Sequence, residues 1–262
     1  MIVKSPDSRS PTPHGSRTDT LTVEVDPSQM YFIQRLKQSD VSALFLVEYN
    51  KERRVLKVVG HAGYVPVLLL MHVEFHNNGD PGFSRDGLRD LDRYRCEARA
   101  YRNLKSHAIC AQGYVPEIYG RIEQLHPSDF APHLDAFLSD SYLPNAILIE
   151  YLLDAQQMNC STYTKKRMAT AVEGIKKIHE ALVEHSDPYP KNILIVPDNL
   201  EMGRSERVVW TDFDVAITYE DASCVGEEQK RWMDEETECV EGFGQLLAED
   251  QKQGLSPNTK FY

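Results

Sequence analysis

Polar and hydrophobic positions alternate over three short runs near the start of the chain, at 31–36, 42–49 and 54–59. Such alternation is typical of β-strands, and the polar turns KQSD and NKER between the runs are short enough for an antiparallel meander. A further mixed run at 65–75 has no clear period. The stretch that follows it, HNNGDPGFSRDG, has the glycine, asparagine and proline content of a long loop.

Longer stretches carry an apolar or aromatic residue at every third or fourth position, which predicts amphipathic helices at 86–105, 164–184 and 232–250. The acidic run DEE at 234–236 is interpreted as the solvent-exposed face and start of the last helix. The apolar run AILIEYLL at 146–153 has the length of a strand.

Two more strand-like runs, 193–196 and 208–210, are separated by a polar connection that contains glycine, and together they predict a hairpin. The predicted elements are therefore a β-meander near the start of the chain, followed by helices, one further strand and one hairpin. This order predicts an α+β fold with a small antiparallel sheet.

Composition and charge limit the partners and the cellular location that are expected for the protein. With 41% hydrophobic residues over 262 positions, the chain can fill a core, whereas residues 1–20 are rich in serine, threonine and proline and predict a flexible leader. The net charge of −11 disfavours nucleic acid and anionic membranes as partners. Five scattered cysteines and the absence of a signal-peptide core or a bilayer-length apolar run favour a reducing, cytoplasmic location.

Two charged residues stand where a buried side chain is expected. In the run VLKVV, strand alternation places Lys57 on the same face as Val55 and Val59. Glu97 shares a predicted helix face with aromatic residues. A buried charge needs an opposite charge, so Lys57 and Glu97 are candidate partners. The alternative is that Lys57 reaches solvent from an edge strand and Glu97 lies at the margin of the apolar face.

Oxygen-bearing side chains gather at one end of the predicted hairpin. Asn192 precedes its first strand and Asp212 follows shortly after its second, so the two should lie close together. Asp187 lies five residues before Asn192 in a loop stiffened by two prolines, and Asp214 follows Asp212. Carboxylate and amide oxygens are ligands that suit Mg²⁺ and, through it, phosphates. A polar turn that caps a hairpin remains the alternative, because these residues are also common in turns.

Taken in order, the strand lysine, the helix glutamate, the loop HSDPYPKN at 185–192 and the motif DFD at 212–214 resemble the protein-kinase-like superfamily. The loop and the DFD look closer to the aminoglycoside phosphotransferase and choline kinase branch than to eukaryotic protein kinases. They are also similar to small uncharacterised fungal kinase-like proteins. The resemblance implies a bilobal fold, with an N-lobe of sheet and one helix over 21–150 and a reduced, mainly helical C-lobe over 151–262.

The resemblance also implies roles for the polar residues. Lys57, held by Glu97, would contact the α and β phosphates of ATP. Asn192 and Asp212 would bind Mg²⁺, with Asp214 as a further candidate ligand. Asp187 would orient a substrate hydroxyl and accept its proton.

Further residues would complete the nucleotide site. His185 would brace the loop and hold the Asp212 region. The segment LIEYL would join the lobes, with the backbone of Glu150 and Leu152 bonding the adenine edge and Ile149 lining the back of the pocket. Ser42 or nearby backbone would cover the phosphates, because KQSDVSA stands where a G-x-G-x-x-G loop is expected.

These implications predict an ATP- and Mg²⁺-dependent phosphotransferase whose partners are a nucleotide and a small molecule with a hydroxyl group. The missing glycine-rich loop and the short C-lobe leave an alternative, a nucleotide-binding pseudokinase or interaction module with weak catalysis. The short C-lobe makes a protein kinase the less favoured expectation. It would also leave apolar surface that a second copy of the chain could cover, so a homo-oligomer remains open.

Overall fold

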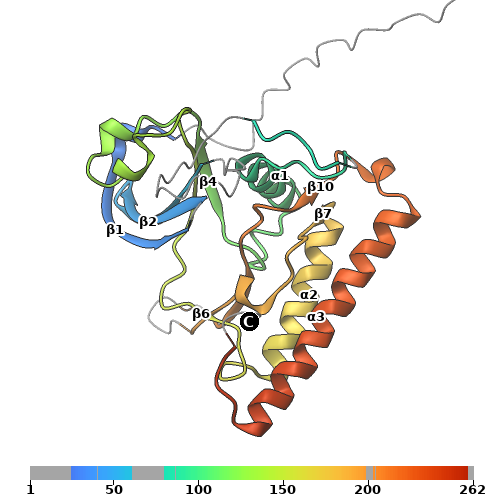
Figure 1. Cartoon of the computed structure of the whole chain (residues 1–262). Helices are drawn as coiled ribbons and strands as arrows, with labels where there is room; N and C mark the ends of the chain where they lie inside the picture. Colours follow the sequence, from blue (N-terminus) through green and yellow to red (C-terminus); the bar gives the residue numbers. More distant parts are fainter. Residues whose placement is uncertain are drawn as a thin grey trace, which may run out of the picture.

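The structure is a computed structural model that describes residues 25–39, 41–60, 80–85, 87–198, 203 and 205–258. The predicted leader at 1–20 and the run at 65–75 lie outside these residues. The described part is a mixed α+β arrangement with a five-stranded antiparallel sheet and three α-helices (Figure 1). The α+β class expected from the order of elements is therefore confirmed.

The five-stranded sheet has the order β1-β2-β3-β5-β4, and every neighbouring pair is antiparallel. Its first three strands form the predicted meander. β4 was not predicted, because its five residues show too short an alternation to stand out from the surrounding loop. The strands are β1 (Met30–Gln38), β2 (Ser42–Tyr49), β3 (Glu52–Val59), β4 (Ile118–Ile122) and β5 (Asn145–Glu150).

The two faces of the sheet pack into different hydrophobic clusters. On β3, Leu56 and Val58 belong to a smaller cluster that also holds Leu134 and Phe137. Their neighbours Val55 and Val59 belong to the larger cluster on the opposite face. The larger cluster is continuous from this face of the sheet through all three helices. The strand period of two therefore directs every second residue of β3 toward the helices.

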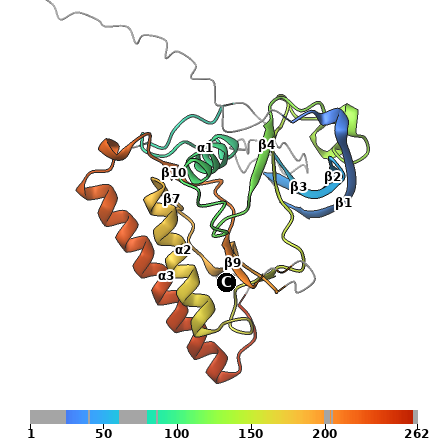
Figure 2. The same ribbon diagram turned by 180° about the vertical axis from the view of Figure 1, so that it is seen from behind.

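All three α-helices contribute residues to the larger cluster, and Figures 1 and 2 show how the helices lie. They are α1 (Arg93–Ser106), α2 (Lys165–Glu180) and α3 (Glu227–Gln253). α2 and α3 run side by side, and α1 lies between that pair and the sheet. Among the described residues, every helix is too polar or too short to cross a bilayer.

The helix predicted at 86–105 begins later than expected, at Arg93. Asp92 caps it, because its side chain accepts the N–H of Arg95 at 3.0 Å. Leu88 and Leu91, which were counted in the apolar face, precede this cap and are exposed. The prediction was wrong here because two leucines in a loop happened to match the helical spacing.

Other boundaries also differ from the predicted ones. The helix predicted at 164–184 ends at Glu180, because Leu182 takes a left-handed conformation with φ of 62°. The chain then forms the short strand β7 (Val183–Glu184), which pairs with β10 (Ile217–Thr218). α3 is longer than the predicted 232–250, and β5 is shorter than the predicted 146–153.

The predicted hairpin is confirmed, with β8 (Ile193–Val196) paired to β9 (Arg207–Trp210). A two-residue strand, β6 (Gln156–Gln157), extends it to three strands. Short 3₁₀ helices occupy several connections. They are Pro27–Gln29, Pro127–Phe130, Asp135–Phe137, Pro190–Asn192 and Ala222–Cys224.

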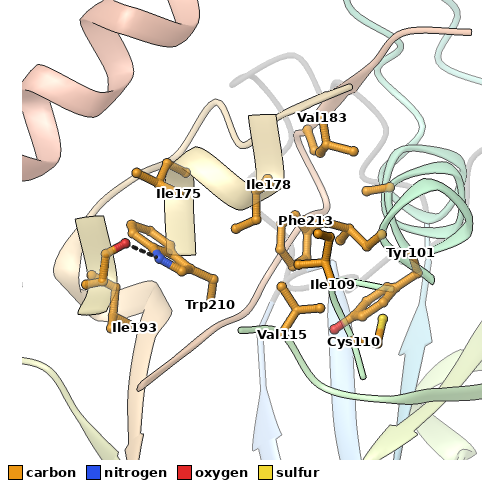
Figure 3. Close-up of a cluster of buried hydrophobic side chains, with 14 of the residues drawn as sticks. Tyr101, Ile109, Cys110, Val115, Ile175, Ile178, Val183, Ile193, Trp210 and Phe213 are labelled. Carbon is orange, nitrogen blue, oxygen red and sulfur yellow. Dashed lines mark hydrogen bonds between the residues drawn. The ribbon is translucent and has the colours of Figure 1, made fainter. Parts of the chain in front are cut away.

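Trp210, the last residue of β9, anchors the hairpin to α2 (Figure 3). Its side chain is fully buried, and its indole N–H donates to the carbonyl oxygen of Ala171 at 2.9 Å. The ring lies so close to α2 that a Cβ added at Gly174 would stand 2.9 Å from Cδ1 of Trp210. Only glycine therefore lets the helix and the hairpin approach this closely.

We expect Gly174→Ala to lower the free energy of unfolding by about 1–3 kcal/mol, because the added methyl group must displace Trp210 from a packed core. Gly242→Ala in α3 is the matched control, since a Cβ there meets nothing within 4 Å. It should raise stability by about 0.5–1 kcal/mol through helix propensity. Urea unfolding measures both, and equal stability of the two variants would contradict the close approach.

Candidate functional site

A buried lysine connects three separate elements. Nζ of Lys57 on β3 lies 2.7 Å from Oε2 of Glu97 on α1 and 2.6 Å from Oδ1 of Asp212, just beyond β9. The Lys57 and Glu97 side chains are 6% and 2% exposed, whereas that of Asp212 is 39% exposed. The structure thus brings together the two residues expected to pair and adds Asp212 as a second carboxylate on the same ammonium group.

The charges of this group depend on one another. Burial alone would lower the pKa of Lys57, but the carboxylates of Asp212 and Glu97 outweigh burial and raise it well above its usual value. The Lys57 ammonium lowers the pKa of Asp212 to about 2. Burial raises the pKa of Glu97 to about 7, against the attraction of Lys57. At neutral pH, Lys57 and Asp212 are therefore both charged, and Asp212 is the carboxylate that faces water.

Backbone geometry turns Asp212 away from the core. Its φ of 68° lies in the left-handed region, which is uncommon for a residue with a side chain. The next residue, Phe213, is fully buried, with its ring centroid 4.8 Å from that of His185 and 5.5 Å from that of Tyr101. Nε2 of His185 lies 3.0 Å from the carbonyl oxygen of Thr211. Phe213 and His185 thus fix the backbone on both sides of Asp212.

The loop at 185–192 holds Asp187 beside Asn192. The side-chain nitrogen Nδ2 of Asn192 donates to both the backbone carbonyl oxygen and Oδ2 of Asp187, at 2.9 Å in each case. Nζ of Lys191 lies 3.1 Å from the same Oδ2. The backbone N–H of Thr211 donates to the carbonyl oxygen of Asn192 at 2.9 Å, which ties the loop to the chain just before Asp212. The two ends of the hairpin therefore meet, as its pairing requires.

A buried glutamate on α3 fixes the backbone at the start of this loop. Glu236 accepts the N–H of His185 at 3.0 Å and that of Ser186 at 2.7 Å, and it also contacts Nε2 of His179 at 2.7 Å. Ser186 has a left-handed φ of 61°, so the two bonds secure a strained turn. The interpretation of 234–236 as a solvent-exposed run was wrong for Glu236. Its spacing of four residues from Val240 on the buried face was the available signal.

Asp214, a predicted metal ligand, pairs with Arg93 at the start of α1, where Nη1 lies 2.6 Å from Oδ2 of Asp214. The Asp214 side chain is 11% exposed. Arg93 was not predicted as part of the site, because only the fold brings α1 and the DFD motif together. The pair competes with metal binding at Asp214, so a metal role for this residue stays a prediction.

One cavity of about 710 Å³ collects the predicted site residues. Every one of them lines it except His185, whose side chain is fully buried. The residues on its wall are Ser42, Lys57, Glu97, Ile149, Glu150, Leu152, Asp187, Asn192, Asp212 and Asp214. The cavity lies where the sheet, α1 and the hairpin meet, and its size is that of a small-molecule site.

In the segment LIEYL, which was expected to bond adenine, Glu150 already forms other contacts. The backbone N–H of Glu150 donates to the carbonyl oxygen of Glu117 at 2.8 Å. Its side chain pairs with Arg207, whose Nη2 lies 2.7 Å from Oε1. Within the described residues, the N–H of Leu152 has no acceptor. Leu152 is therefore the better placed donor of the two.

The oxygen donors fit a magnesium ion that also binds a phosphate. The described ranges contain no cluster of three or more histidine, cysteine, aspartate or glutamate residues that could hold a metal by themselves. Mg²⁺, however, usually binds one or two carboxylates together with water and substrate phosphates. Asp212, charged and partly exposed, and the side-chain oxygen of Asn192 can supply that smaller set.

Comparison of the sequence with models of known protein families and with curated proteins finds no match.

We expect Lys57→Met to lower the free energy of unfolding by about 3–5 kcal/mol, because it leaves Glu97 buried without a cation. The double variant Lys57→Met/Glu97→Leu should recover much of that loss, since no buried charge remains. Arg53→Met is the matched control, because Arg53 is an exposed cation on the same strand. Denaturant unfolding measures all three, and a double variant less stable than Lys57→Met would contradict the proposed pairing.

Proposed function

We propose that the protein is an ATP- and Mg²⁺-dependent phosphotransferase of bilobal kinase-like fold that acts on the hydroxyl group of a small molecule. One observation carries the proposal. Two pairs of side chains from distant parts of the sequence, Lys57 with Glu97 and Asp187 with Asn192, line a single cavity together with Asp212, which binds Lys57 directly. Phosphoryl transfer needs this combination, a fixed cation and metal-binding oxygens beside a carboxylate that can accept a proton.

The cavity wall suggests how a nucleotide would lie. Ile149 and Leu152 offer apolar contact and a backbone N–H to the adenine ring at one end. Lys57 would bind the phosphates, because its ammonium is charged and held in place by Glu97. Asp212 and Asn192 would hold Mg²⁺, which neutralises charge that builds on the transferred phosphoryl group.

Asp187 would act on the hydroxyl group of the acceptor molecule. Its carboxylate is 26% exposed and is oriented by Asn192 and Lys191. The acceptor oxygen would form a bond to the γ-phosphorus of ATP while the bond to the β,γ-bridging oxygen breaks. ADP then leaves, and the hydroxyl proton passes to Asp187.

The connection after the DFD motif supports a small acceptor. Residues 215–226 lead through β10 and one 3₁₀ helix directly into α3. A chain that docks a protein substrate needs a longer segment or extra helices near this point, and this connection supplies neither. The proposal therefore favours a metabolite over a polypeptide as the acceptor.

A second candidate is a nucleotide-binding module that does not turn over. The observation that favours it is the pairing of each carboxylate on the cavity wall with a cation of this chain, including Asp214 with Arg93. A catalyst has to exchange some of these pairs for metal and phosphate. A binding module has no such requirement.

Thermal unfolding with Mg²⁺ATP, followed by ADP release across a panel of hydroxylated metabolites, tests the proposal. ATP at 100 times its dissociation constant should stabilise the protein by about 2.7 kcal/mol. Asp187→Asn should lower turnover by about 10²–10⁴-fold and leave ATP affinity nearly unchanged, because Asp187 acts on the acceptor proton.

Asp234→Asn is the matched control, since Asp234 is an exposed acid on α3 away from the cavity. It should behave like the wild type in both assays. Binding of ATP without ADP release for any acceptor would favour the module instead. No stabilisation by ATP, with Asp212→Asn unfolding like the wild type, would overturn both candidates.

A further inference from the structure

The turn between β1 and β2 uses its own backbone donors. The hydroxyl oxygen of Ser39 accepts the N–H groups of Val41 and Ser42 at 3.4 and 3.1 Å, and its backbone N–H donates to the carbonyl oxygen of Ser42 at 2.8 Å. The Ser39 and Ser42 hydroxyls lie 3.2 Å apart. A phosphate-binding loop works by pointing free N–H groups at the ligand. In this turn, which lines the cavity, the N–H groups of Ser39, Val41 and Ser42 donate to acceptors within the turn itself.

Two cations on the cavity wall form no ion pair with the residues that the structure describes. Lys57, Arg93 and Lys191 are each paired with a carboxylate of the same wall. Lys37 and Arg89 also line the cavity, yet neither side chain forms an ion pair or hydrogen bond within the part of the chain that the structure describes. In a protein of net charge −11, two unpaired cations on one cavity are available for an anionic ligand.

Hydrogen bonds and ion pairs hold the segment that carries Arg89. Its N–H donates to the hydroxyl oxygen of Ser84 at 2.9 Å, and its carbonyl oxygen accepts the N–H of Ser84 at 2.8 Å. The next residue, Asp90, is buried and binds the guanidinium groups of Arg95 and Arg99 on α1. Asp90 therefore ties this segment to α1, and Arg89 beside it lines the cavity.

Lys37 approaches from the other wall. It lies near the end of β1, opposite Leu44 of β2, and its side chain is exposed. Its charge contributes to the lowered pKa of Asp212, after the larger effect of Lys57. The Lys37 ammonium therefore acts on the same part of the cavity as Asp212.

We infer that Lys37 and Arg89 bind the phosphate chain of the nucleotide, in place of the backbone donors that a glycine-rich loop would supply. The inference rests on the proposed function and adds to it the groups that select a triphosphate over an uncharged nucleoside. Recognition by two exposed cations depends on charge and not on fixed backbone geometry. Nucleotide affinity should consequently fall as salt is added.

The test compares Lys37→Gln/Arg89→Gln with the wild type by calorimetric titration with Mg²⁺ATP and with adenosine. The double variant should bind ATP about 10-fold or more weakly, since hydrogen bonds to charged groups are among the strong ones, and should bind adenosine within about twofold of the wild type. Raising NaCl from about 0.05 to 0.5 M should weaken ATP binding by the wild type more than by the variant.

Arg53→Gln/Arg102→Gln is the matched control, because it removes the same charge from residues that do not line the cavity. It should keep the ATP affinity and the salt dependence of the wild type. If the Lys37/Arg89 variant binds ATP as the control does, the inference is wrong and the proposed function stands. If the wild type binds neither ATP nor adenosine, the proposed function fails and the inference fails with it.

Discussion

The rest of the structure depends on the two ion pairs that the ammonium group of Lys57 forms with Glu97 and Asp212. A charge in a side chain only 6% exposed is costly unless opposite charges reach it, and here Glu97 and Asp212 do so from α1 and from the end of the hairpin. These contacts require the sheet, α1 and the hairpin to meet at one point. The cavity lies at that point, so the same pairing that satisfies the buried charge also assembles the candidate site.

The surrounding core holds the place where the sheet, α1 and the hairpin meet. Trp210 fixes the hairpin to α2, and Phe213 packs between His185 and Tyr101. Glu236 secures the strained backbone at the start of the loop that carries the proposed base. Fully buried rings and a buried carboxylate therefore determine where the exposed polar groups of the cavity can lie, which is the preorganisation that the proposed phosphoryl transfer would require.

Local patterns were enough to predict the meander, the hairpin and the face of β3 on which Lys57 lies, because a period of two and a short connection determine them. The start of α1 was predicted wrongly, since leucines in the loop at 80–91 match helical spacing by chance. Arg93 and Glu236 were not predicted as site residues, because their partners, Asp214 and the loop at 185–192, are distant in sequence. Contacts of that kind depend on how the helices pack and leave no local periodic signal.

The most direct test of the central claim is a crystal structure of the protein with a non-hydrolysable ATP analogue and Mn²⁺ in place of Mg²⁺. We expect an anomalous peak at the metal position within about 2–2.3 Å of oxygens of Asp212 and Asn192, with the phosphate chain beside Lys57. A nucleotide bound elsewhere, or a metal held without either of these residues, would contradict it.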